Sequence, residues 1–219
     1  MSERGYITTA ILQAGLVAVV HADFGVATVL EISDALLAVP LPVMAVALPN
    51  PHALDTITDL RARHGGNLVV GATHVTDAAQ AHAALDAGAQ FLLTEGDHAA
   101  IDRQAVGRDR LVIPLCREPR ALAAFARVPV VACVLASGIV DEAADALIPW
   151  QPTSRHGGQL LLACGPIGGD NIGACARAGF SAAIIGYDHA AATAWSARDL
   201  IVRVRALRTA WTTAALDRE

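Results

Sequence analysis

Reactive side chains in this sequence come directly after short runs of apolar, β-branched residues. Runs of that kind are typical of buried parallel strands, and a barrel of such strands gathers reactive groups where its strands end. The end of the barrel at which the strands finish, here called its mouth, could therefore collect imidazoles, carboxylates, thiols and a guanidinium from separate parts of the chain. The positions are His21, Asp23, His74, Glu95, Cys116, Arg117, Ser137, Cys164, Tyr187, Asp188 and His189.

Two kinds of chemistry suit this set. Neutral imidazoles with a carboxylate, such as His21, His74 and Glu95, could bind a divalent metal, although their wide spacing is not a metal-binding motif. Alternatively, His74 and Glu95 could act as an acid–base pair while Arg117 binds an anionic substrate. A third alternative is a closed salt-bridge network that only finishes the edge of the barrel.

A glycine-rich turn precedes a predicted helix near the C-terminal third of the chain. Gly165, Gly168 and Gly169 stand before Asp170, and backbone N–H groups at such a turn can hold a phosphate. Pro166 removes one donor, and Asp170 places a negative charge beside the site. The competing interpretation is an ordinary turn with a capped helix.

The chain contains no lysine, because all 16 of its basic residues are arginines. Imine chemistry needs an amine that can lose its proton, and a guanidinium stays charged at physiological pH. No side chain of this sequence can form a Schiff base.

Composition and charge exclude several classes of protein. Hydrophobic residues make up 54% of the 219 residues but aromatic residues only 4%, so the core must consist of Ala, Val, Leu and Ile. The net charge of −5 is spread along the chain without a basic block, which argues against nucleic acid as a partner. The most apolar stretch, 35–49, is too short to span a membrane and is interrupted by Pro40 and Pro42.

Four cysteines without CxxC spacing and an N-terminus unlike a signal peptide predict a cytoplasmic protein with reduced thiols.

Strand-like and helix-like segments alternate throughout, which predicts a (β/α)8 TIM barrel with a leading N-terminal helix, forming one domain over residues 1–219. The expected strands are 16–20, 43–48, 68–71, 90–93, 110–115, 130–135, 159–163 and 181–185. The expected helices are 3–14, 24–39, 51–64, 77–87, one near Asp97, 118–127, a segment from Asp141, 170–178 and a closing helix with an apolar stripe of Leu200, Val204, Leu207 and Trp211. Residues 149–158 read as a loop.

Several segments match a known family in order and at near-constant spacing. GATHVTDAAQAHAALDAGAQFLLTEG (71–96) is similar to the family's GAGTV, helix, AGAQF and SPG; LVAVVHAD (16–23) is similar to its first strand. VMAVALPNP (43–51) parallels IEVTLRTP, and VIPLCREP (112–119) parallels IPGVATP. In these segments the chain resembles the 2-keto-3-deoxy-6-phosphogluconate / 4-hydroxy-2-oxoglutarate (KDPG/KHG) aldolases.

The working residues of that family do not carry over. The resemblance places Ala132 where the family has its Schiff-base lysine, and Ala45 where it has its catalytic glutamate. The other departures are Ala47 and Pro49 for the Thr and Arg of the second strand, His74 (or Thr73, at an offset of one) for the Thr of GAGTV, Glu95 for the Pro of SPG, Cys164-Gly165-Pro166 for Thr-Gly-Gly, and Ile185-Gly186-Tyr187 for Gly-Gly-Ser.

The candidate residues for binding a small anionic metabolite, an oxo acid or a phosphate, are Arg117, Gly165, Gly186 and Tyr187. The resemblance implies a barrel that assembles as a homotrimer. Three functions stay open. The barrel is a non-catalytic or repurposed binder without a cofactor, or a lyase or isomerase that uses His74 and Glu95, or an aldolase that stabilises the enolate with a divalent metal.

We predict that borohydride will not trap pyruvate or an aldehyde on any internal residue of this protein, because no side-chain amine is available to form the imine. The measurement is the intact mass after incubation with pyruvate and borohydride. A stoichiometric adduct on an internal residue, or KDPG cleavage that persists after metal chelation, would refute the prediction.

Overall fold

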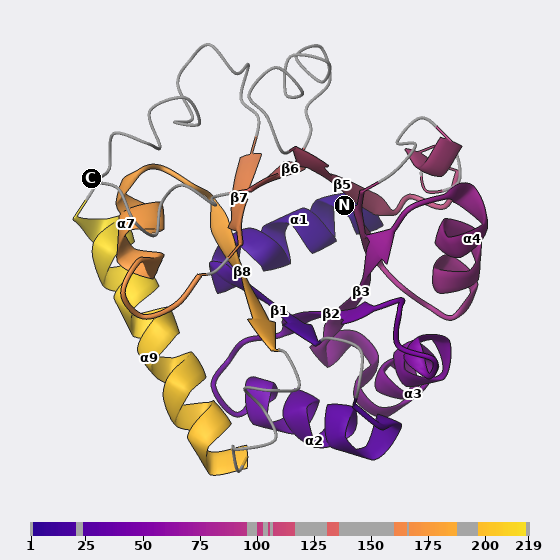
Figure 1. Cartoon of the computed structure of the whole chain (residues 1–219), viewed down its shortest axis with the longest axis horizontal. Coiled ribbons are helices and arrows are strands. Elements are labelled where there is room, and N and C mark those ends of the chain that lie inside the picture. The colour runs from indigo at the N-terminus through magenta and orange to yellow at the C-terminus, as the bar shows by residue number, and fades with distance from the viewer. Residues whose placement is uncertain are drawn as a thin grey trace.

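Eight parallel strands form a closed barrel in the order in which they occur along the chain (Figure 1). The computed structural model describes residues 2–20, 24–95, 100–102, 105, 107–116, 131–135, 160–165, 167–187 and 197–217. The strands are β1 (Leu16–Val20), β2 (Val43–Ala47), β3 (Val69–Val75), β4 (Phe91–Thr94), β5 (Leu111–Cys116), β6 (Val131–Leu135), β7 (Leu160–Cys164) and β8 (Ala182–Tyr187). The predicted TIM barrel is confirmed.

The ring closes through β1, which pairs with β2 on one side and β8 on the other. Val19 stands opposite Ala45 of β2 and Gly186 of β8. Every residue of β1 and β2 is buried, as expected for strands covered on both faces. Ala132 lies on β6 opposite Leu161, at the strand position that the resemblance gives it.

Helices surround the barrel. The helices with bounds among the described residues are α1 (Glu3–Ala14), α2 (Val26–Leu37), α3 (Ala53–His64), the short 3-10 helix η1 (Gly65–Asn67), α4 (Ala78–Asp86), α7 (Ile172–Arg177) and α9 (Ala197–Leu216). Figure 1 shows α9, α2, α3 and α4 following one another around the outside, with α7 beside α9. The predicted stripe of α9 is buried at all four positions. No helix among the described residues is long and apolar enough to cross a membrane.

The leading helix α1 lies across the ring of strands (Figure 1). Glu3, in its first turn, forms an ion pair with Arg110 and accepts a hydrogen bond of 3.4 Å from the Gln90 side chain. Gln90 and Arg110 directly precede β4 and β5, so α1 is attached at the N-terminal end of the barrel. The C-terminal end, where strands deliver reactive groups, is the opposite end.

Most expected elements lie within a few residues of their observed bounds. The helix at 3–14 and the strand at 16–20 have the predicted bounds. The main difference is β3, which continues to Val75 instead of ending at Gly71, because a bulge lets the strand extend beyond its regular part. The expected helix at 118–127, the segment from Asp141 and the loop at 149–158 lie outside the described residues.

A close approach between Gly71 and Phe91 fixes how β3 packs against β4. The two residues are paired across the strands, and a Cβ added to Gly71 would stand 2.4 Å from the fully buried Phe91 ring. No larger residue fits without moving β3 or the ring.

We predict that Gly71→Ala lowers the free energy of unfolding by about 1–3 kcal/mol, the usual cost of overpacking a core. Gly66→Ala is the matched control, since a Cβ there meets nothing within 4 Å. Denaturant titration measures both, and combining Gly71→Ala with Phe91→Leu should recover part of the loss. Equal stability of the Gly71 and Gly66 variants would contradict the proposed contact.

Candidate functional site

The ends of β3 and β4 bring an imidazole and a carboxylate together. His74 is the residue before the last one of β3, and Glu95 directly follows β4. The distance from His74 Nε2 to Glu95 Oε1 is 3.7 Å. The side chains are 36% and 29% exposed, so both groups are accessible at the C-terminal mouth but partly shielded from water.

The backbone at His74 is unusual. Ala72 pairs with Leu92 and Val75 with Thr94, so two residues of β3 oppose the single residue Leu93 of β4. This β-bulge carries His74 at φ 59°, in the left-handed region that residues with a side chain seldom adopt. Bulges next to active sites redirect side chains, and backbone strain concentrates at functional positions.

Hydrogen bonds on both sides hold the bulge in place. The Leu48 N–H, just after β2, donates to the Thr73 carbonyl at 3.1 Å, and the Glu95 N–H donates to the Val75 carbonyl at 2.9 Å. The second bond ties the backbone of Glu95 to β3. These two backbone hydrogen bonds at the ends of the strands therefore help to set the distance between His74 and Glu95.

The next residues lead the chain from the bulge into α4. Asp77 is the N-cap of this helix and accepts from the N–H groups of Ala79 and Gln80, both at 2.8 Å. The Gln80 side chain accepts in turn from the Thr76 N–H at 2.9 Å. These local bonds leave the backbone around His74 little freedom to relax.

His74 and Glu95 together could exchange a proton with a ligand or bind an anion. At 3.7 Å the two groups are beyond hydrogen-bond length but form an ion pair when the imidazole is protonated. A protonated His74 can bind an anion, and a neutral His74 or ionised Glu95 can accept a proton from a bound carbon acid.

Asn50 joins the two loops that follow β1 and β2 at the C-terminal end of the barrel. It is not among the candidate site residues identified from the sequence. It is 3% exposed; its Nδ2 donates to the Phe24 carbonyl at 3.1 Å, and its Oδ1 accepts from the His52 N–H at 2.8 Å. The segments after β1 and β2 are thereby held together. The Asn-Pro dipeptide, a common start of a turn, was the available signal.

The glycine-rich turn after β7 uses part of its own hydrogen-bonding capacity. The Gly168 N–H donates to the Asn171 side chain at 2.9 Å, and the Ile167 N–H donates to the Gly165 carbonyl at 2.7 Å. Asn171 stands at the N-cap of α7 but makes no capping bond with its side chain. Two of the amides that a phosphate would need are therefore paired within the turn.

The other selected residues fall into two groups. Gly186 and Tyr187 belong to β8, opposite Val19 and Val20, while Cys116 and Cys164 end β5 and β7. The second group lies outside the described residues: His21, Asp23, Arg117, Ser137, Asp188 and His189. Across the described part of the chain, no three His, Cys, Asp or Glu side chains gather as a metal site. The proposed metal site of His21, His74 and Glu95 therefore stays a prediction.

Comparison with known proteins decides the family. The family model described as "KDPG and KHG aldolase" matches residues 7–140. The chain belongs to this aldolase family. No match was found among curated proteins.

Solved structures share the same fold at low identity. The KDPG aldolase of Zymomonas mobilis ZM4 with 3-phosphoglycerate has a TM-score of 0.73 and 20% identity, covering 92% of this chain and 94% of that one. A Legionella pneumophila KDPG aldolase with pyruvate captured as a covalent carbinolamine gives 0.66 and 17%, covering 93% and 96%. The tryptophan synthase α subunit of Legionella pneumophila str. Paris gives 0.74 and 12%, covering 97% and 99%. Similarity at this level shows the barrel alone.

Cys164 and Cys175 are poorly placed for thiol chemistry. Cys164 is 8% exposed and Cys175 is fully buried. Burial raises the pKa of the Cys175 thiol to about 11, so the nucleophilic thiolate is scarce at neutral pH. Both residues are small side chains packed in the core.

We predict that His74→Gly gives a more stable protein than His74→Ala by about 1 kcal/mol, because glycine adopts a positive φ without the steric cost that alanine bears. Both variants remove the imidazole, so their difference reports the backbone alone. Urea unfolding measures it. An alanine variant as stable as the glycine variant would show that the backbone at position 74 is not strained.

Proposed function

We propose that this member of the aldolase family binds a small oxo acid at the C-terminal mouth of its barrel without forming an imine. The observation that carries the proposal is the pair of His74 and Glu95, held 3.7 Å apart on a strained bulge in a chain that has no lysine. The mouth thus offers charge and proton transfer but no amine.

The absence of an imine follows from the side chains of the sequence. A carbinolamine, the state in which the Legionella aldolase holds pyruvate, needs a nitrogen that attacks the carbonyl carbon. Here the resemblance places Ala132 of β6 at that position, and every basic side chain of the sequence is a guanidinium or an imidazole. We therefore expect the ligand to be bound by charge and hydrogen bonds, without an imine.

The ligand class follows from the charges at the mouth and from the family. KDPG itself is a phosphorylated oxo acid, so an anion is the expected ligand. A protonated His74 attracts a carboxylate, and Arg117, which follows β5, is the proposed second cation. Gly165, Gly186 and Tyr187, from β7 and β8, are the proposed contacts on the far side of the mouth.

Proton transfer is the second candidate function, because the pair has the groups that enolisation requires. One of them removes a proton from the carbon next to the carbonyl, and the other donates a hydrogen bond to the enolate oxygen. That chemistry makes a lyase or an isomerase. A metal-assisted route would need a third ligand, for which His21 is the candidate.

We predict that pyruvate or 2-oxoglutarate raises the melting temperature of the wild type, by about 5–10 °C at 100 times the dissociation constant. Arg117→Ala and His74→Gln should each reduce the shift, since each removes one cation from the mouth. His82→Gln is the matched control, because it alters another His–carboxylate pair, with Asp86 at 3.0 Å on the exposed face of α4. Equal shifts in all four proteins, or none in any, would reject the site.

Exchange of the pyruvate methyl protons with deuterated solvent separates the two candidates. A proton-transfer enzyme exchanges them, and His74→Gln abolishes the exchange. A binder gives the thermal shift without exchange. Exchange that stops on addition of a chelator assigns the chemistry to the metal-assisted route.

A further inference from the structure

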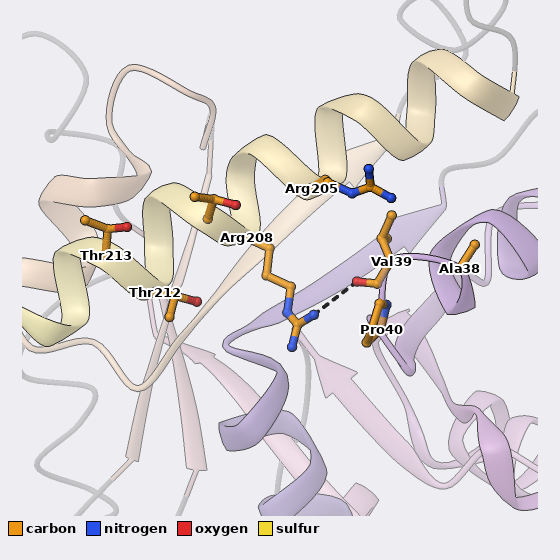
Figure 2. Close-up of a pocket in the computed structure, with 8 residues that line it drawn as sticks. Ala38, Val39, Pro40, Arg205, Arg208, Thr212 and Thr213 are labelled. Carbon is orange, nitrogen blue, oxygen red and sulfur yellow. Dashed lines mark hydrogen bonds between the residues drawn. The ribbon is translucent and has the colours of Figure 1, made fainter.

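A groove lies on the outside of the barrel, between α9 and the connection from α2 to β2 (Figure 2). Its volume is about 400 Å³. It is lined by Ala38, Val39, Pro40, Arg205, Arg208, Thr209, Thr212 and Thr213. The connection precedes β2, and Trp211 of α9 packs against Gly15, which precedes β1. The groove is therefore near the N-terminal end of the barrel, away from the mouth that holds His74.

The polar residues of the groove share one face of α9. Arg205 and Arg208 are three residues apart, and Thr209 and Thr212 follow each of them by four, so all four side chains are neighbours on the helix surface. The adjacent stripe of Val204, Leu207 and Trp211 is buried in the core. The core thus fixes the rotation of the helix and with it the direction of the polar face.

One of the two arginines is already oriented. Arg208 Nη1 donates a hydrogen bond of 3.2 Å to the carbonyl of Val39, which is itself buried. Figure 2 shows Arg205 and Arg208 both reaching from α9 toward the segment of Val39 and Pro40. The two guanidinium groups thus line one groove.

Among the described residues, no carboxylate balances the positive charge of the groove. No acidic residue lines it, and no carboxylate among the described residues forms an ion pair with Arg205 or Arg208. Two like charges three residues apart on a helix repel each other. The chain as a whole carries a net charge of −5, so this concentration of positive charge is a local feature.

We propose that this groove binds the phosphate group of a small phosphorylated metabolite, independently of the function proposed for the mouth. A phosphate carries enough charge to neutralise both guanidinium groups and enough acceptor oxygens for both and for the threonine hydroxyls. A volume of about 400 Å³ is within the range of small-molecule sites. The anion removes the repulsion between Arg205 and Arg208.

The test is isothermal titration calorimetry with glycerol 3-phosphate and, in a second arm, inorganic phosphate at constant ionic strength. All proteins carry His74→Gln, which weakens any binding at the mouth. The groove variant is Arg205→Gln/Arg208→Gln. The matched control is Arg198→Gln/Arg203→Gln, which removes two arginines of the same helix that do not line the groove. Thermal unfolding checks that each variant is folded.

We expect the groove variant to bind glycerol 3-phosphate at least about tenfold more weakly, the effect of losing one charge-assisted hydrogen bond, and the control to bind like its parent. A hydroxyl-free variant, Thr209→Val/Thr212→Val, should also bind more weakly with its charge unchanged. Binding of inorganic phosphate as tight as that of the ester assigns the site to phosphate itself. Equal loss in the groove and control variants, or no binding of either probe by the parent, would overturn the proposal.

Discussion

The closure of eight parallel strands into one ring is the constraint on which the other features depend. Strands such as β1 and β2 are buried along their whole length, so their walls admit only apolar and small side chains. Polar groups that could react or bind must therefore stand where the strands end. The arrangement explains why His74 and Glu95, more than twenty residues apart in the chain, meet at one edge of the barrel.

The two ends of the barrel are built for different tasks. At the N-terminal end, Glu3, Gln90 and Arg110 attach α1 across the strands, and their polar groups are used in holding the structure together. At the C-terminal end, the bulge places an imidazole in an unfavourable backbone conformation beside a carboxylate. Stabilising contacts at one end allow the strain at the other, a division common in barrels of this fold.

The sequence predicted the barrel well because its periodic apolar runs report burial directly. The stripe of α9 and the bounds of α1 were both readable from residue type alone. It also predicted that His74 and Glu95 would meet, since both follow neighbouring strands. The sequence did not predict that β3 extends to Val75, because no residue type in the segment GATHV (71–75) indicates a bulge at His74. Nor did it show the groove of Arg205 and Arg208, which forms only when α9 packs against a connection some 165 residues earlier in the chain.

The bulge in β3 has a genetic consequence. It consists of one residue more on β3 than on β4, counted between the pairs Ala72–Leu92 and Val75–Thr94. Deletion of a single codon would restore a regular ladder without displacing the strands on either side, and a single insertion would recreate the bulge. We therefore expect that a single codon separates a regular strand from one that carries His74 on a bulge at the mouth.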